Sequence, residues 1–359
     1  MAIYIFCSKC HATRELKHIK QTQNLIRGTC KKCGAIIVKD SSKAKIIKPI
    51  TEKVTNITEK IQIGPIYSNN SHIINQTTRN IEVIKEAFRQ SSEINFVQRM
   101  YNNSYSVIIG IDDYKEEQSL SNACNDARSI NRVLENDYKF INLIPPLYNS
   151  EATKDKLEEI FVDTISNNQG SKEMGQQDRL IIYYSGHGKL RKITNLDGTK
   201  SKEGFIIPYD GKKGGDYKNI SMETIIKSCQ RCIAKHVLLI LDCCYSGFAA
   251  TRSSIDNLQQ IDNRYLDDLA SRRAIQVLAA GQDDQLVSDS GIRQGHSAFT
   301  GALLDILENK LDLNNDGIIS VREIAYYLET QVAMHSSLYQ RPVYNEIAGS
   351  QNGDFLFKI

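Results

Sequence analysis

Apolar runs alternate with amphipathic segments over the last two thirds of the chain. Unbroken apolar runs are typical of strands that are buried on both faces of a parallel sheet, and helical spacing of apolar residues is typical of the helices that cover it. Strands are predicted at 107–111, 180–184, 237–241 and 274–279. Helices are predicted at 122–135, 150–165 with Ser150 as N-cap, 221–234 and 297–309.

Weaker extended segments are expected at 143–148 and 204–208. Strands that alternate with helices imply right-handed crossovers. The sequence therefore predicts an α/β fold for residues 101–359, in which a mainly parallel sheet is flanked by helices.

The first 40 residues have a different pattern, with two Cys-x-x-Cys pairs that comprise Cys7, Cys10, Cys30 and Cys33. Four thiolates at this spacing can close a tetrahedral Zn²⁺ site, and about forty residues rarely build a sufficient core without such a staple. Residues 1–40 are therefore predicted to form a small zinc ribbon. With no open metal position for catalysis, the ribbon is expected to dock a partner, either a protein or a nucleic acid.

Residues 41–100 are rich in Lys, Ser, Asn and Thr and contain a Gly64-Pro65 break, which is typical of a linker. Within this linker, Ile81, Ile84 and Phe88 have the spacing of one short amphipathic helix.

Composition narrows the class of protein. The hydrophobic fraction is 41%, the charged fraction is 24% and the net charge is +3, so bulk charge does not demand a nucleic acid or an anionic membrane. The N-terminus lacks the basic start of a signal peptide, and no apolar run approaches the roughly 20 residues that span a bilayer. A cytoplasmic location is expected, where cysteines serve metal binding and catalysis rather than disulfides.

Two of the predicted strands end in reactive side chains. The segment 180–188 contains His187 just after its strand, and the segment 237–247 contains Cys243 and Cys244, of which one is the candidate nucleophile. Parallel strands end at one edge of a sheet, so an imidazole and a thiol are expected side by side there. A thiol beside an imidazole is a nucleophile with its activator. Because side chains alternate along a strand, only one of the two cysteines can face His187.

Four short motifs occur in a fixed order: Ile109-Gly-Ile-Asp-Asp-Tyr114, Ala123-Cys-Asn-Asp126, Tyr184-Ser-Gly-His-Gly188 and Asp242-Cys-Cys-Tyr-Ser-Gly247. Together they resemble the caspase-like cysteine peptidases, most closely the metacaspase branch and its bacterial relatives. The resemblance covers residues 105–359. Tyr245 departs from the His that is common at this position in metacaspases.

The resemblance implies a cysteine endopeptidase with a Cys244–His187 dyad, in which Cys243 occupies the variable position of the motif. The backbone N–H groups of Gly188 and Cys244 would hold the oxyanion. Asp126 and Asp242, with Ser185 beside them, map onto the acidic S1 pocket of metacaspases. Two carboxylates that face one pocket favour a cation, so the implied substrates are proteins or peptides cut after Arg or Lys.

The segment 312–323 fits the twelve-residue EF-hand loop, with Gly317 at its sharp turn. Its expected Ca²⁺ ligands are Asp312, Asn314, Asp316, Ile318 through its carbonyl, Ser320 and Glu323. EF-hands usually pair and this one is single, so the alternative is an acidic turn that holds no metal. A bound calcium ion is expected to be structural or regulatory, with calcium-stimulated activity as the regulatory case.

A function of another class is also compatible with these modules. The chain would then be a non-proteolytic, calcium-responsive adaptor whose zinc ribbon binds a protein or a nucleic acid. The complete set of His187, Cys244 and the two acids favours the enzyme, because a scaffold needs none of them. Three further residues are expected to be structural: Cys229, Cys232 and His296.

Overall fold

The structure is a computed structural model. It describes four strands within the first 40 residues and then residues 100–359, with gaps at 195–196, 244–262, 282–292 and 336–339. The chain divides into two compact units, residues 1–84 and residues 85–359. The predicted linker and its amphipathic helix lie outside the described residues, apart from Met100.

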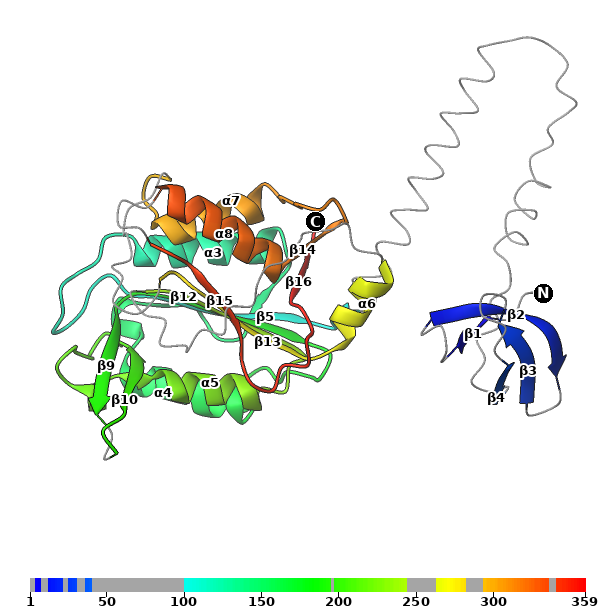
Figure 1. Ribbon diagram of the computed structural model, residues 1–359. Helices are drawn as coiled ribbons and strands as arrows, with labels where there is room; N and C mark the ends of the chain where they lie inside the picture. Colours follow the sequence, from blue (N-terminus) through cyan, green and yellow to red (C-terminus); the bar gives the residue numbers. More distant parts are fainter. Residues whose placement is uncertain are drawn as a thin grey trace, which may run out of the picture. The chain divides into compact units, whose positions relative to one another are not determined.

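The first unit contains an antiparallel sheet whose strands follow in the order β1-β2-β3-β4 (Figure 1). The bounds are β1 Tyr4–Cys7, β2 Ala12–Gln21, β3 Leu25–Cys30 and β4 Ile36–Asp40. Cys7 lies opposite Ala12 of β2, and Cys30 lies opposite Leu16 of the same strand. Cys7 is thus opposite the first residue of β2 and Cys30 is opposite its middle, while Cys10 and Cys33 lie outside the described residues.

The second unit is built on a sheet in which the four predicted strands lie side by side. Its order is β15-β13-β12-β8-β5-β6, and β7 also pairs with β5. All pairings are parallel except that of the edge strand β15. The bounds are β5 Ser104–Gly110, β6 Ile141–Asn142, β7 Leu147–Tyr148, β8 Arg179–Ser185, β12 His236–Asp242, β13 Ala274–Ala279 and β15 Val343–Glu346. The predicted α/β fold with a mainly parallel sheet is confirmed.

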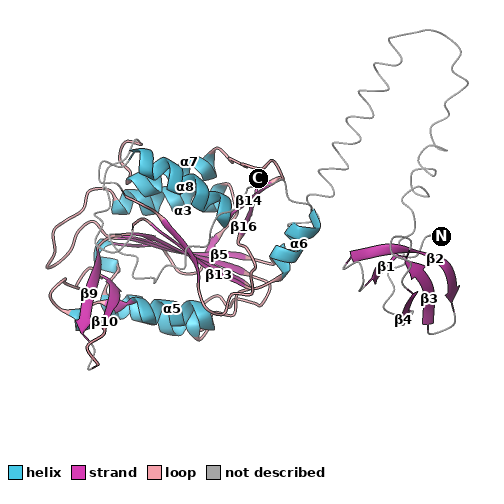
Figure 2. Ribbon diagram, viewed as in Figure 1, coloured by secondary structure: helices cyan, strands magenta, loops and turns pink. Residues whose placement is uncertain are grey.

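Helices cover both faces of this sheet (Figure 2). One face carries α3 Ala123–Asn136, α7 Ala298–Glu308 and α8 Val321–His335, and the other carries α4 Lys154–Glu158 and α5 Met222–Arg231, as the labels of Figure 1 show. Alternate residues of each strand enter the two cores: Leu238 and Ile240 pack towards α3 and α7, whereas Leu239 and Leu241 pack towards α4 and α5. Burial on both faces explains why the strands are apolar throughout.

The predicted helix at 150–165 differs from the observed structure. Ser150 lies in a short 3-10 turn, η2 Asn149–Glu151, and the helix begins only after Thr153, whose side chain accepts a hydrogen bond from the Lys156 N–H. After α4 the chain continues as a π-helix, η3 Glu159–Ser166. Ser150 is therefore not the N-cap, because the left-handed Asn149 (φ 48°) turns the chain first.

Several elements have no counterpart among the predictions. The segment expected at 204–208 is the end of a hairpin formed by β9 Gly188–Thr194 and β10 Lys200–Ile206, which also pairs with β11 Ile220–Ser221. The charged residues of this hairpin conceal its strand character in the sequence. The remaining elements are α6 Asn263–Ser271, η4 Asp216–Lys218, β14 Ile318–Ser320 and β16 Leu356–Lys358.

Candidate active site

The predicted reactive segments leave the sheet next to each other. Strands β8 and β12 are paired in parallel, and Ser185 at the end of β8 lies opposite Asp242 at the end of β12. His187 follows β8 by two residues, and the segment with Cys243 and Cys244 follows β12. Cys244 itself lies outside the described residues, so its assignment as the nucleophile stays a prediction.

His187 is held by two contacts from one loop. Its side chain and backbone are largely buried, with 9% of its surface exposed. The His187 backbone N–H donates to the Tyr114 hydroxyl at 2.6 Å, and the imidazole Nε2 lies 2.7 Å from the Gln118 carbonyl oxygen. A carbonyl oxygen can only accept, so Nε2 carries the proton. In the neutral ring, Nδ1 is therefore the nitrogen that can take a proton from a thiol.

Glycine is required between Ser185 and His187. A Cβ atom on Gly186 would lie 2.6 Å from the Tyr114 hydroxyl and 2.7 Å from the Tyr184 hydroxyl. These two tyrosines fill the space beneath the turn, since Tyr184 donates to the His187 carbonyl oxygen at 2.7 Å. Gly188 then begins β9 directly after the imidazole, which is where an oxyanion donor was predicted.

The loop that supplies Tyr114 and Gln118 is anchored to the segment after β10. Glu116 forms ion pairs with Lys212 at 3.0 Å and Lys218 at 2.6 Å. Hydrogen bonds from Lys218 and Lys212 lower the pKa of Glu116 to about 2, so the carboxylate stays ionised at any pH suited to a peptide assay. The sequence did not predict that Tyr114 and Gln118 would hold His187. The only indication was that Tyr114 is the last residue of the first motif.

Cys243 is 2% exposed and belongs to the hydrophobic core on the α4 and α5 side of the sheet. This core also contains Leu239 and Leu241, which share its face of β12. Its burial matches the interpretation of Cys243 as a packing residue.

The three residues predicted for the substrate pocket lie around one buried polar cluster. Asp126 in the first turn of α3 is 0% exposed, Asp242 is 4% exposed, and Ser185 is paired with Asp242 across the strands. Ser297, the N-cap of α7, joins the two acids: its N–H donates to Asp126 at 3.3 Å and its hydroxyl donates to Asp242 at 2.5 Å. The fold thus connects two carboxylates that are 116 positions apart in the sequence.

Asp126 and Asp242 each have a second partner. His296 Nδ1 lies 2.6 Å from Asp126 Oδ1, and the Thr300 hydroxyl donates to Asp242 Oδ2 at 2.5 Å. His296 was expected to be structural, and nothing in its sequence context pointed to Asp126. The cluster is next to the strand ends that lead to His187 and Cys244.

The segment predicted as an EF-hand loop follows α7 and leads through β14 into α8. Asn315 and Gly317 adopt positive φ values of 59° and 86°, and the Gly317 N–H donates to Asp312 Oδ2 at 2.7 Å. The Glu323 carboxylate accepts from the N–H groups of Leu313 at 3.1 Å and Ser320 at 2.9 Å. Instead of a second EF-hand loop, β14 pairs with β16.

The carboxylates of this loop are the type of ligand that binds calcium, but their present positions do not form a binding site. Burial raises the pKa of Asp316 and of Glu323, which are carboxylates held away from water. Oxygen donors are those that calcium prefers. In the part of the chain that the structure describes, however, no three His, Cys, Asp or Glu side chains are arranged to hold a metal ion. Calcium would have to draw the loop carboxylates away from their present backbone partners.

Two acidic residues that follow the His187 strand, Asp216 and Glu203, are paired with basic side chains. Asp216 pairs with Lys189 and, at 2.7 Å, with Arg191, and Glu203 pairs with Arg191 as well. Hydrogen bonding to Lys189 lowers the pKa of Asp216. These acids are compensated by basic side chains of the hairpin and do not form a cation site.

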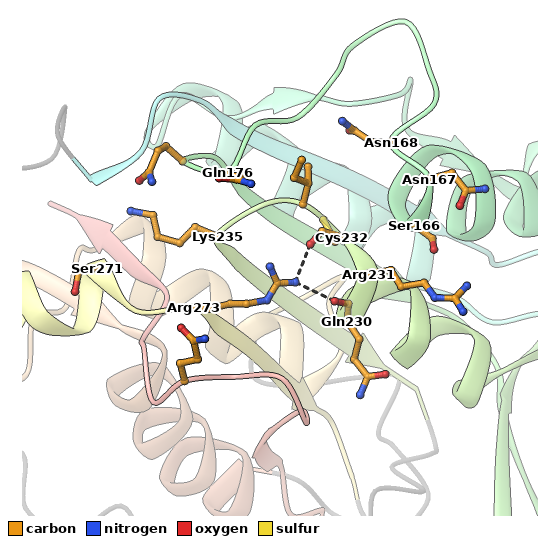
Figure 3. A pocket seen from close by; sticks show the side chains of 13 residues that line it. Ser166, Asn167, Asn168, Gln176, Gln230, Arg231, Cys232, Lys235, Ser271 and Arg273 are labelled. Atoms are coloured by element: carbon orange, nitrogen blue, oxygen red, sulfur yellow. Dashed lines mark hydrogen bonds between the residues drawn. The ribbon is translucent and has the colours of Figure 1, made fainter.

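A cavity of about 580 Å³ lies at the opposite edge of the sheet, before β8, β12 and β13 (Figure 3). Arg231, Lys235 and Arg273 line it together with several amide side chains. Arg273 donates to the Gln230 and Cys232 carbonyl oxygens at 3.1 and 2.7 Å, and so caps the end of α5. Burial raises the pKa of the Cys232 thiol to about 11, so this cysteine is protonated and unreactive. The cavity is unrelated to the predicted catalytic residues.

A parallel sheet that presents an oriented imidazole beside a cysteine-bearing strand end defines the site of a thiol hydrolase. The comparison with protein families gives the same class. The caspase domain model of peptidase family C14 matches residues 103–348, and the chain belongs to this family of cysteine-type peptidases.

Metacaspase-1A of Neurospora crassa is 25% identical over 144 residues, which are 40% of this chain and 31% of the relative. The match therefore spans less than a third of that protein.

Two solved structures are similar at lower identity. A protein from Geobacter sulfurreducens has a TM-score of 0.47 and 17% identity, over 68% of this chain and 93% of that chain. Caspase-1 from Spodoptera frugiperda has a TM-score of 0.42 and 9% identity, over 68% and 86% of the two chains. Among the described residues, no helix is long and apolar enough to cross a membrane.

Proposed function

We propose that this protein is an endopeptidase that cuts peptide bonds after Arg or Lys, with Cys244 as the nucleophile and calcium as a stimulating ion. The observation that carries the peptidase is the orientation of His187, whose Nε2 is fixed on the Gln118 carbonyl oxygen so that Nδ1 can accept a proton.

In the proposed reaction, Nδ1 of His187 takes the Cys244 thiol proton and the thiolate attacks the scissile carbonyl carbon. The protonated imidazole then gives its proton to the leaving amine, and water hydrolyses the resulting thioester. The backbone N–H groups of Gly188 and Cys244 would hold the oxyanion, a contribution of about 3–4 kcal/mol per donor where it has been measured in other enzymes. The Gln118 carbonyl would stabilise the imidazolium form.

The preference for Arg or Lys rests on Asp126 and Asp242. Both carboxylates are buried and tied to one another through Ser297. Two buried negative charges repel each other unless a cation compensates them, and the cationic end of a substrate side chain would do so. A carboxylate substrate side chain would add a third negative charge, so cleavage after Asp is not expected.

Calcium stimulation rests on the position of α7. Ser297, the N-cap of this helix, contacts both acids. The helix ends at Glu308, just before the loop 312–323. Asp312, Asn314, Asp316, the Ile318 carbonyl, Ser320 and Glu323 would hold the ion. An ion there would compensate the buried carboxylates and fix the end of α7 that is distant from the acids.

The proposal also includes a structural Zn²⁺ in the first unit and a cytoplasmic location. The support for zinc is the spacing of the two Cys-x-x-Cys pairs, and the structure adds that the strands carrying Cys7 and Cys30 both pair with β2. Within the described residues, Cys124, Cys229, Cys232 and Cys243 are not joined in disulfides, as suits a reducing compartment. One zinc per chain, lost in Cys7→Ser and retained in Cys229→Ala, would support the ribbon.

The deciding experiment is hydrolysis of matched fluorogenic peptides that end in Arg, Lys or Asp. Each is assayed with calcium and with a chelator, on wild-type protein and on Cys244→Ala. Cleavage after Arg or Lys that disappears in Cys244→Ala is the expected result. Cleavage after Asp would contradict the pocket assignment, and equal rates with calcium and chelator would contradict calcium stimulation. If no peptide is cut under any condition, the calcium-responsive adaptor becomes the better account.

A further inference from the structure

The start of α7 makes a short strap across the two buried acids. The strap comprises Gly295, His296 and Ser297, with Thr300 one turn further along the helix. Gly295 has φ 77°, a left-handed conformation that favours glycine, and its carbonyl oxygen accepts from Asn125 in α3 at 2.5 Å. This turn brings His296 and Ser297 onto the neighbouring Asp126.

Each strap side chain has a defined donor role. His296 Nδ1 lies 2.6 Å from Asp126 Oδ1, and in either protonation state a proton on Nδ1 can point at this carboxylate. The Ser297 hydroxyl accepts from the Thr300 N–H at 2.9 Å, so its own proton is available to Asp242 at 2.5 Å. Thr300 adds its hydroxyl to Asp242 and lies 2.6 Å from the Tyr183 hydroxyl.

Hydrogen bonds to a carboxylate favour its ionised form, whereas burial and a second carboxylate disfavour it. Both effects disfavour the ionised forms of Asp126 and Asp242, because each carboxylate is buried and the other lies nearby. The strap supplies the hydrogen-bond donors that compensate them. Ser297 contributes to both acids at once, through its N–H and its hydroxyl. The charge and the direction of the two carboxylates therefore depend on the strap as well as on the acids themselves.

We propose that His296 and Ser297 are specificity-determining residues, which hold the two carboxylates ionised and oriented towards a cationic substrate side chain. The inference rests on the proposed cleavage after Arg or Lys. The two residues are positioning residues, because they act on the substrate through Asp126 and Asp242.

The test compares two peptides that differ only in the last side chain, Arg or its neutral isostere citrulline. The ratio of kcat/KM values for these peptides measures how strongly the pocket recognises charge. In His296→Leu and Ser297→Ala we expect this ratio to fall about tenfold, because each variant removes a hydrogen bond to a charged carboxylate. His296→Asn, whose amide can donate from the position of Nδ1, should keep the ratio within about threefold of wild type.

A matched control separates the contact to Asp242 from helix capping. Ser221 is the N-cap of α5 and accepts from the Thr224 N–H at 3.1 Å, as Ser297 does for α7. Ser221→Ala should lower stability without changing the Arg-to-citrulline ratio. The rate at which iodoacetamide alkylates Cys244 should stay within about twofold in every variant, which shows that the catalytic pair is intact.

The outcomes distinguish the inference from the proposed function. If wild type cuts after Arg but the variants lose activity on both peptides equally, the strap is only structural and the inference is wrong. The inference is equally wrong if Ser221→Ala lowers the ratio as much as Ser297→Ala does. If wild type neither binds nor cuts the Arg peptide, the pocket itself is wrong and the inference fails with it.

Discussion

The imidazole Nε2 of His187 lies 2.7 Å from the carbonyl oxygen of Gln118, a residue 69 positions earlier in the chain. This contact fixes which ring nitrogen carries the proton, because the carbonyl oxygen can only accept. The same loop supplies Tyr114, whose ring centroid lies 4.7 Å from that of His187. The base is therefore oriented by a loop and not by the strand that carries it.

Tyr114→Phe should reduce kcat without a comparable change in KM. The substitution removes the acceptor of the His187 backbone N–H, and an unsatisfied buried donor costs about 1–3 kcal/mol. A shift of the imidazole by even a fraction of an ångström would lower kcat about tenfold or more. The measurement is steady-state hydrolysis of the Arg peptide. Tyr217→Phe, at a tyrosine that is 76% exposed, is the control and should behave as wild type.

Cys243→Ala should keep most of the activity that Cys244→Ala abolishes. Cys243 is a buried core residue, so its truncation is expected to lower the free energy of unfolding by about 1 kcal/mol. Urea unfolding and peptide hydrolysis are measured on both variants. Full activity in Cys244→Ala together with an inactive Cys243→Ala would reverse the assignment.

Calcium should raise the melting temperature of the wild-type protein, and Glu323→Gln should remove this effect. Glu323 is 1% exposed at the start of α8 and would be the bidentate ligand, whereas Glu329 is exposed on the same helix. Glu329→Gln is therefore the matched control and should retain the calcium shift. Thermal unfolding with calcium and with chelator tests both. An equal calcium shift in Glu323→Gln would place the ion elsewhere.

The buried Asp354 should make stability depend on pH. Burial raises the pKa of this carboxyl from 3.8 to about 6 in the folded protein. Between these values this carboxyl binds more protons in the folded than in the unfolded state, so its contribution to the free energy of unfolding falls as the pH rises, by on the order of 2 kcal/mol. The buried His236, whose pKa burial lowers to about 3, contributes in the opposite direction. Asp354→Asn removes the contribution of this carboxyl, so from pH 4.5 to pH 7 the free energy of unfolding should change more favourably in the variant than in wild type.

Urea unfolding at pH 4.5 and pH 7 measures the difference. Asp267→Asn changes an exposed carboxyl and should leave the pH dependence as in wild type. The idea fails if Asp354→Asn also retains the full dependence.

The sequence alone determined the α/β fold, the four central strands and the edge at which His187 and the cysteine pair emerge. Each follows from local information, because apolar runs of strand length report burial on both faces and parallel strands end together. Ser185 and Asp242 directly follow two of these predicted strands, whereas their place in a substrate pocket was implied by the resemblance to metacaspases.

Only the tertiary structure decided what surrounds these residues. Tyr114 and Gln118 reach His187, and His296 and Ser297 reach Asp126, through loops that join positions 69 to 171 residues apart. The donors and acceptors include backbone groups, which every residue carries and which no residue type reveals. The sequence therefore specifies the reactive side chains, while the folded loops decide their protonation, their orientation and their charge environment.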